Sequence, residues 1–127
     1  VGSGSGWTTA LLAHIVGEEG EVIGVEIDEE LVDFGRENLS AYGFDNARIT
    51  SADNAVLGLP QEGPYDRILV SAAAQGRVPQ ELVGQLKEDG VLVAPVDDFI
   101  EKVSRDGRER FEGFSFVPLL YPSEEAR

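Results

Sequence analysis

The first 17 residues, VGSGSGWTTALLAHIVG, constrain the fold more than any other part of the chain. Glycines occupy positions 2, 4 and 6 and lead directly into an apolar segment with helical periodicity. Glycine lets a backbone approach a ligand closely, and the first turn of a helix offers unpaired N–H groups. The pattern therefore indicates a strand-to-helix turn that either holds a ligand or serves only as a structural connection.

The spacing of these glycines narrows the kind of ligand. A G-x-G-x-x-G dinucleotide fingerprint would need a glycine at position 7, where the chain has Trp7. The G-x-G-x-G spacing of Gly2, Gly4 and Gly6 instead suits a ligand without pyrophosphate. Such a ligand would lay an amino-acid carboxylate and a ribose across the turn.

Two acidic residues fall where further contacts to such a ligand are expected. Glu26 ends the apolar strand EVIGVE, and an acid at this place can accept hydrogen bonds from both ribose hydroxyls. Asp53 follows the next expected strand and would lie at the same carboxyl edge of the sheet. An ordinary strand-end carboxylate and an ordinary turn aspartate would give the same pattern.

Apolar periodicity switches repeatedly between helical and strand-like along the chain, which predicts an α/β fold with a mostly parallel sheet. Asp28 is the expected N-cap of a helix whose inward stripe is Leu31, Gly35, Leu39 and Tyr42. A C-terminal antiparallel hairpin at a sheet edge is expected to enclose Phe111, Phe114 and Phe116. The predicted helices are 7–16, one from 29, and 79–86; the predicted strands are 21–26, 47–50, 66–70, 91–96, 99–104 and 109–116.

The composition of the chain limits which classes of function it can have. A length of 127 residues suits a single domain, 1–127, and the net charge of −14 disfavours binding to a nucleic acid. The chain has no cysteine, which fits a reducing, cytoplasmic compartment, and no apolar run near the about 18 residues that a membrane helix needs. Only Val1 precedes the glycine loop, so we expect a fragment that begins inside its first strand.

Several segments together resemble the protein-L-isoaspartate O-methyltransferase family. The segments VGSGSGWTTALLAHIVG, VIGVEID, PYDRILVSAAAQGRVPQELVGQLKEDGVLVAPV and FVPL follow one another in the family's order over nearly all of the chain. The glycine loop and Glu26 are shared by many methyltransferases that use S-adenosylmethionine. The AAA…VPQ.L..QLK..G block and the FVPL ending are more particular to the isoaspartyl branch.

The resemblance implies a Rossmann-like sheet of the class I methyltransferase type, with the first strand and the N-terminal helices largely missing. It implies that Gly2, Ser3 and Gly4 face the methionine part of S-adenosylmethionine, that Glu26 holds the ribose, and that Asp53 meets the adenine amine. It also places Ala72, Ala73 and Val78 at the isoaspartyl substrate.

The implied reaction methylates the α-carboxylate of isoaspartyl residues in damaged proteins. The protein is expected to be a monomer. Because a carboxylate is already ionised at neutral pH, it can attack the methyl group without a general base. No side chain is therefore assigned as the catalyst, no metal is expected, and the single histidine, His14, is expected to be a packing or surface residue.

Two departures keep other functions open. Ala52-Asp53-Asn54 replaces the family's Gly-Asp-Gly, and the substrate-binding segment that precedes the glycine loop in the family is missing. Another class I enzyme, such as a transfer-RNA adenine methyltransferase, shares the loop and the acid. An inactive cofactor-binding fragment is the third possibility.

Overall fold

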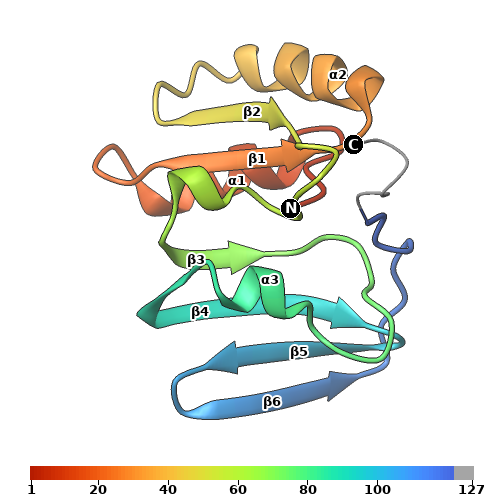
Figure 1. Cartoon of the computed structure of the whole chain (residues 1–127). Helices are drawn as coiled ribbons and strands as arrows, with labels where there is room; N and C mark the ends of the chain where they lie inside the picture. Colours follow the sequence, from red (N-terminus) through yellow and green to blue (C-terminus); the bar gives the residue numbers. More distant parts are fainter. Residues whose placement is uncertain (122–127) are drawn as a thin grey trace. The chain divides into compact units, whose positions relative to one another are not determined.

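The computed structural model describes residues 1–121 of the chain (Figure 1). This part folds into two compact units: Gly2–Ala52, and Val1 together with the segment from Asp53 onward. The expected single domain 1–127 stays a prediction, and its residues 122–127 lie outside the described part.

The Gly2–Ala52 unit consists of two helices and a parallel strand pair. Its elements are α1 (Trp7–Val16), β1 (Val22–Glu26), α2 (Glu29–Ser40) and β2 (Ala47–Ser51). β1 and β2 run side by side, with Gly24 opposite Ile49 (Figure 1). Both helices pack on the face of this pair that carries Gly24 and Ile49, where Ala10, Val32, Leu39 and Ile49 form the core. The predicted helices and strands of this region are confirmed.

The start of α2 follows the sequence prediction, but its buried stripe does not. The Asp28 carboxylate accepts hydrogen bonds from the backbone N–H groups of Glu30 and Leu31 at 2.9 and 3.3 Å, as an N-cap residue does. The helix then buries Val32, Gly35 and Leu39. Leu31 and Tyr42 are exposed, so assigning them to the inward stripe was wrong. The buried face therefore begins at Val32, three residues before Gly35, and not at Leu31, four residues before it. Tyr42 lies beyond the end of the helix.

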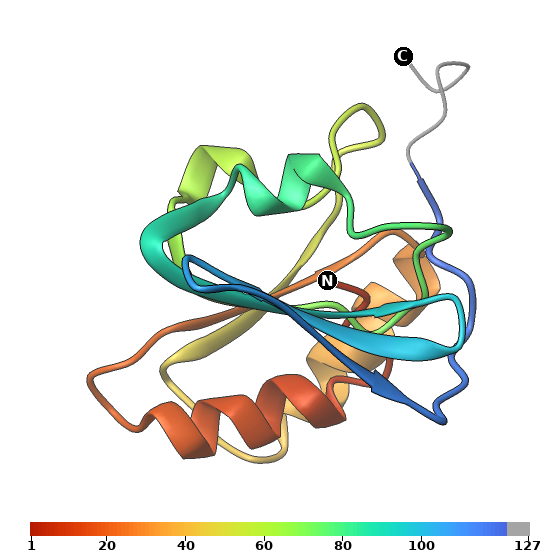
Figure 2. The ribbon, with the colours of Figure 1, turned by 90° about the horizontal axis from the view of Figure 1, so that it is seen from below.

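The second unit is built on a four-stranded sheet in the order β3-β4-β5-β6. Its elements are the short 3-10 helix η1 (Pro60–Glu62), β3 (Tyr65–Leu69), α3 (Gln80–Val83), β4 (Leu86–Val96), β5 (Phe99–Ser104) and β6 (Gly107–Glu112). β3 and β4 are parallel, whereas β4, β5 and β6 form antiparallel neighbours. Figure 2 shows η1 and α3 on one side of this sheet. Val78, Leu82, Leu92, Ala94 and Val96 belong to the core on that side.

The helix predicted over 79–86 is shorter than expected. α3 ends at Val83, and β4 already begins at Leu86, which pairs with Tyr65. The buried Gln85 explains the early end: its side-chain amide accepts from Leu59 N and donates to Leu57 O, at 3.0 and 2.8 Å. A helical continuation would carry Gln85 and Leu86 away from these partners.

The C-terminal hairpin forms at the sheet edge as predicted, but its second strand, predicted over 109–116, spans Gly107–Glu112, and its phenylalanines are not its core. Phe111, Phe114 and Phe116 are 49, 42 and 39% exposed, and every residue of β6 is exposed. The core prediction was therefore wrong for all three. The buried side chains of the hairpin lie on β5 instead, because β5 has a strand on each side and β6 is the edge.

Candidate functional site

The glycine loop is anchored to the end of β1 through its backbone. Gly2 and Ser3 donate N–H bonds to Val25 O at 2.8 and 3.2 Å, and Gly6 N–H closes a turn on Ser3 O at 3.0 Å. The φ angles of Gly2, Gly4 and Gly6 are +78, +50 and +82°, a region that side chains disfavour. A Cβ on Gly4 would meet nothing within 4 Å, so this part of the loop leaves open space beside the backbone.

The loop also lies against α2 without intervening side chains. A Cβ on Gly6 would come within 2.8 Å of Gly35 O, and a Cβ on Gly35 would come within 2.8 Å of Gly4 O. Gly24 is similarly crowded by Thr9 Oγ1 at 2.8 Å and by Ser3 Cβ at 3.0 Å. Glycine is therefore required on the helix and on the strand as well as in the loop. Gly35 had a sequence signal, since it lies in the predicted stripe, whereas Gly24 had none.

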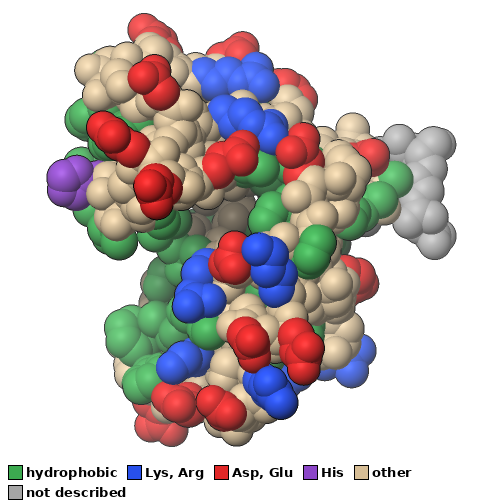
Figure 3. Space-filling view, turned by 90° about the vertical axis from the view of Figure 1, so that its left-hand side faces the viewer, with side chains coloured by type: hydrophobic (Ala, Val, Ile, Leu, Met, Phe, Trp, Pro, Cys, Tyr) green, Lys and Arg blue, Asp and Glu red, His purple; other side chains and the backbone are tan. Residues whose placement is uncertain are grey.

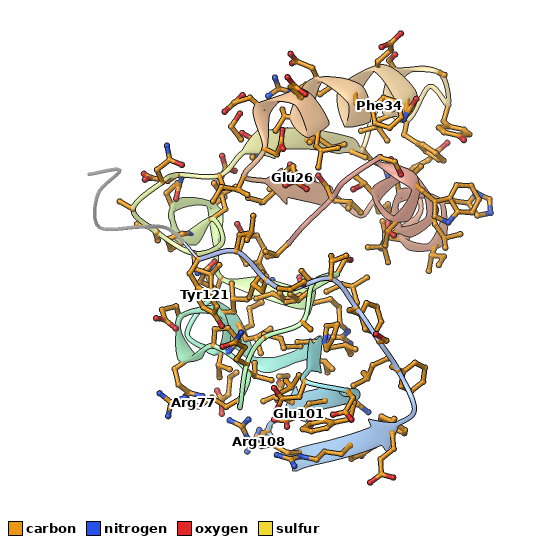
Figure 4. The ribbon with its side chains drawn as sticks, turned by 90° about the vertical axis from the view of Figure 1, so that its right-hand side faces the viewer. Glu26, Phe34, Arg77, Glu101, Arg108 and Tyr121 are labelled. Atoms are coloured by element: carbon orange, nitrogen blue, oxygen red, sulfur yellow. The ribbon has the colours of Figure 1, made fainter. Side chains whose placement is uncertain are left out.

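Glu26 ends β1 and is 8% exposed (Figure 4). Its Oε2 accepts the N–H of Gly4 at 2.9 Å, and its Oε1 accepts the N–H groups of Ile27 and Asp28 at 2.9 and 3.2 Å. A carboxylate has about four acceptor positions. These bonds leave about one position, on Oε2, for a further donor. Glu26 thus shapes the loop and keeps an acceptor beside it.

Ser3 supplies the test of whether a ligand fits here. Its Oγ is buried and, within the described residues, has no hydrogen-bond partner. Buried hydroxyls nearly always have a partner, because leaving one unpaired is unfavourable. A ligand that carries both hydrogen-bond donors and acceptors, bound in the loop, would pair with Ser3 Oγ and with the remaining acceptor position of Glu26. The residues present therefore fit a polar ligand such as S-adenosylmethionine.

Asp53 opens the second unit in a tight turn. Its Oδ1 accepts from Ala55 N–H at 2.7 Å, and its carbonyl accepts from Val56 N–H at 3.4 Å. The side chain is exposed. This is the geometry of a turn aspartate, and the exposed carboxylate retains acceptor capacity for a further donor.

The predicted substrate residues belong to the segment that follows β3. Ala72 and Ala73 are buried, and Val78 is fully buried in the core. The backbone of Ala73 is bridged to Pro118: its N–H donates to Val117 O at 2.7 Å and its carbonyl accepts from Leu119 N–H at 2.8 Å. The FVPL segment of the sequence therefore lies beside this loop, which brings two motifs of the resemblance together.

The described structure distributes the predicted site residues over the two units. The residues expected at the methionine and ribose groups, Gly2, Ser3, Gly4 and Glu26, come together in the Gly2–Ala52 unit. Asp53, Ala72, Ala73 and Val78 belong to the other unit. Sequence reasoning missed Asp97, which is bonded to the loop after β3, although an aspartate pair directly after a strand was a signal for a turn.

Tyr121, two residues after the FVPL segment, has a perturbed phenol. Burial raises the pKa of Tyr121 above its ordinary value, and the negative charge of Glu81 raises it further. Both effects disfavour the phenolate.

Within residues 1–121, the remaining reactive groups form no candidate metal site. His14 is exposed, as Figure 3 shows. Within residues 1–121 there is no cluster of His, Cys, Asp and Glu that could hold a metal ion. No helix in the same range is long and apolar enough to cross a membrane. Trp7 is 63% exposed and is not packed under the loop.

The alternating helices and strands, the glycine loop bonded to a strand-end glutamate, and the antiparallel hairpin define an α/β domain of the methyltransferase type. The chain belongs to the protein-L-isoaspartate(D-aspartate) O-methyltransferase family, whose model matches residues 1–120.

Curated relatives carry the same family name. A protein-L-isoaspartate O-methyltransferase of Methanopyrus kandleri is 43% identical, with 94% of this chain and 57% of the relative aligned. One of Methanocella arvoryzae is 42% identical over 94% of this chain and 66% of its own length. The chain thus spans about half to two thirds of these relatives.

Two solved structures show the same fold. One titled protein-L-isoaspartate O-methyltransferase matches with a TM-score of 0.82 at 24% identity, over 93% of this chain and 40% of its own. A SAM-dependent methyltransferase from Aquifex aeolicus matches with a TM-score of 0.59 at 21% identity, over 76% of this chain and 54% of its own. Both likenesses support the Rossmann-like fold predicted from the sequence.

Proposed function

We propose that this chain carries the methyl-transfer core of a protein-L-isoaspartate O-methyltransferase, which methylates the α-carboxylate of isoaspartyl residues in damaged proteins. The observation that carries the proposal is the family match over residues 1–120, which includes both the glycine loop and the FVPL segment. Cytoplasmic location and a monomeric state are part of the same proposal, as is the absence of nucleic-acid and membrane partners.

S-adenosylmethionine would supply a methyl group on a sulfonium, which a carboxylate can attack directly. In the proposed arrangement Gly2, Ser3 and Gly4 hold the amino-acid part of this cofactor. The buried, unpaired Ser3 Oγ supports this assignment. Glu26 holds the ribose, and the acceptor position left on its Oε2 supports one hydroxyl contact. Asp53 takes the adenine amine as a hydrogen-bond acceptor.

The chain's residues are proposed to act by alignment. Ala72, Ala73 and Val78 form the substrate wall; all three are buried, and the exposed part of the same loop is residues 75–77. Holding two reacting groups in one orientation contributes on the order of several kcal/mol to the barrier. A substrate carboxylate needs no protein base, so this alignment accounts for the lack of an assigned catalytic side chain.

The test combines binding and transfer on the same chain. Calorimetry with S-adenosylmethionine and S-adenosylhomocysteine measures the cofactor site, and methyl transfer is then measured with an isoaspartyl peptide and its aspartyl twin. We expect binding, and transfer to the isoaspartyl peptide alone. Binding without transfer would limit the proposal to the cofactor site, and no binding would contradict both parts.

A matched pair of variants distinguishes the loss of a contact at the cofactor site from the loss of a negative charge elsewhere on the chain. Glu26→Ala removes the buried carboxylate at the loop, whereas Glu18→Ala removes the same charge from an exposed turn after α1. We expect cofactor binding to weaken in the first variant and to stay at the wild-type level in the second.

A further inference from the structure

The segment that follows β3 is held on both sides by backbone bonds. On one side Ala73 is bridged to Pro118. On the other side Ala74 is bridged to Val96, and Ala74 N–H donates to Pro95 O at 3.0 Å. The buried half of the loop therefore behaves as a short strand inserted between the end of β4 and the C-terminal segment. After Ala74 this pairing ends, and Gln75, Gly76 and Arg77 are exposed.

Asp97 forms two further hydrogen bonds to the loop, to Ala74 and to Gly76. Its N–H donates to Ala74 O at 2.9 Å, and its carboxylate Oδ1 accepts the N–H of Gly76 at 3.1 Å. The two bonds fix the loop backbone on either side of Gln75. Gly76 itself has a φ of +73°, so the bond fixes a turn that has little intrinsic preference to stay in place.

Asp97 is the first residue of the two-residue turn that joins β4 to β5. Its φ of +52° is the one positive value among the non-glycine residues that the structure describes. Two-residue hairpin turns favour a positive φ at this position, so the turn accounts for the conformation and places the carboxylate within reach of Gly76. Aspartate and asparagine tolerate this region better than other side chains, but glycine adopts it freely.

Core stability does not account for the hydrogen bond between the Asp97 carboxylate and the Gly76 N–H. Asp97 and Gly76 are both exposed, and an exposed carboxylate is well satisfied by water. The bond between them links two exposed segments that lie 21 positions apart in the sequence. What it determines is the direction of the exposed half of the loop.

We propose that Asp97 is a positioning residue that sets the path of Ala74–Gly76 and thereby the shape of the isoaspartyl pocket. The inference rests on the proposed function, in which this loop forms the substrate wall. Asp97 touches neither substrate nor cofactor in this account. It acts through the backbone of Gly76, so its loss affects substrate affinity more than the rate of the bound complex.

The experiment uses variants that separate the carboxylate from the backbone. Asp97→Gly keeps the left-handed backbone accessible and removes the acceptor for Gly76 N–H. Asp97→Asn tolerates the same φ and retains Oδ1 as an acceptor. The matched control is Asp98→Ala, which removes a neighbouring exposed carboxylate while the backbone bond from Phe114 N–H to Asp98 O remains possible.

For Asp97→Gly we expect KM for an isoaspartyl peptide to rise about fivefold to tenfold, the scale of one lost hydrogen bond. The kcat and the affinity for S-adenosylhomocysteine should stay at wild-type values. Asp97→Asn should restore KM, and Asp98→Ala should resemble the wild type. An unchanged KM in Asp97→Gly overturns the proposal, and so does a lower melting temperature accompanied by loss of kcat alone.

A second measurement covers the case in which the wild-type chain transfers no methyl group. That result would count against the proposed function, and amide hydrogen exchange at Gly76 then decides the positioning role. Faster exchange in Asp97→Gly, with protection restored in Asp97→Asn, supports the hold on the loop. Equal exchange in all three proteins overturns it.

Discussion

Gly4 and Glu26 are joined by a hydrogen bond of 2.9 Å from the Gly4 N–H to Glu26 Oε2. The bond ties the centre of the glycine loop to the last residue of β1. The same carboxylate accepts the N–H groups of Ile27 and Asp28, at the turn into α2. One side chain therefore stabilises the loop, the strand end and the helix entry, while it is also the proposed ribose acceptor.

This double role leads to the first prediction. Glu26→Ala should weaken binding of S-adenosylhomocysteine by roughly 1 to 3 kcal/mol, the scale of charge-assisted hydrogen bonds. It should also lower the melting temperature, because three backbone N–H groups lose their acceptor. Glu26→Gln keeps one oxygen acceptor and should lose less stability. Calorimetry and thermal unfolding measure the two effects separately, and an unchanged affinity in Glu26→Ala would contradict the ribose assignment.

The second prediction concerns the close approach of α2 to the loop. Gly35→Ala places a Cβ 2.8 Å from Gly4 O and 2.9 Å from Ile49 Cδ1, so the loop or the helix must move. We expect a loss of about 1 to 3 kcal/mol in the free energy of unfolding, the scale of overpacking, and weaker cofactor binding. Urea denaturation and calorimetry report both quantities.

Gly84→Ala is the matched control for that change. Gly84 has a φ of −64°, and the nearest atom to an added Cβ is 3.5 Å away. Alanine fits this conformation and restricts the unfolded chain, so the variant should gain about 0.4 to 1 kcal/mol. Equal destabilisation by the two alanines would show that the approach of Gly35 to the loop is not the cause.

The third prediction concerns a buried carboxylate in the hairpin. Glu101 on β5 is 1% exposed and is paired with Arg108 and with Arg110, the latter at 3.2 Å (Figure 4). Arg110 also lies 4.4 Å from the centroid of the Phe99 ring. The two arginines are partly exposed, so water can solvate them after Glu101 is removed, whereas Glu101 itself is buried.

Replacing both arginines with methionine should therefore destabilise the chain strongly, by about 3 kcal/mol or more, since a buried charge loses its partners. Glu101→Leu should be tolerated far better, because the two arginines that lose their partner are partly exposed and can be solvated by water. Thermal unfolding of the two variants gives the order. A larger loss in Glu101→Leu than in the double arginine variant would refute this reasoning.

The fourth prediction is a pH effect at Tyr121. Its pKa is raised in the folded chain, first by burial and second by Glu81, so the folded state retains the phenolic proton to a higher pH than the unfolded chain does. The associated stability is present below the ordinary tyrosine pKa of 10.0 and is lost as the pH rises through the folded value. Glu81→Gln should move the titration of Tyr121 toward lower pH.

The ultraviolet absorbance of the phenolate follows this titration, and the difference between the wild type and Tyr121→Phe isolates Tyr121 from Tyr42 and Tyr65. Identical titrations with and without Glu81 would show that the Glu81 charge has no influence on the phenol.

Much of the secondary structure was predictable because its causes are local. The 7–16 helix, the strand that ends at Glu26 and the Asp28 cap were read from periodicity and from residues within one turn of each boundary, and all are confirmed. The glycine spacing likewise predicted a strand-to-helix loop at the start of α1, and the structure adds that Gly2, Gly4 and Gly6 have positive φ angles.

Burial was predicted less well, since it depends on partners that are distant in the chain. Periodicity alone favoured Leu31 and Tyr42 on α2, but contact with β2 selects Val32. The phenylalanines after Phe99 were predicted to form a hairpin core, yet β6 is an edge strand that leaves Phe111 exposed, and Phe114 and Phe116 lie beyond its end. An apolar residue becomes core only where another element covers it.

The sequence by itself determined the order of the elements, the glycine loop, the position of Glu26 after it and the family, because these depend on residue type and on spacing along the chain. Only the tertiary structure decided which groups meet: Glu26 with Gly4, Gly35 with the loop, Glu101 with two arginines, and Asp97 with Gly76. Apart from the Glu101 pairs, which cross one hairpin, these contacts join residues 21 or more positions apart in the sequence. They form only when packing brings their backbones together, which no local pattern records.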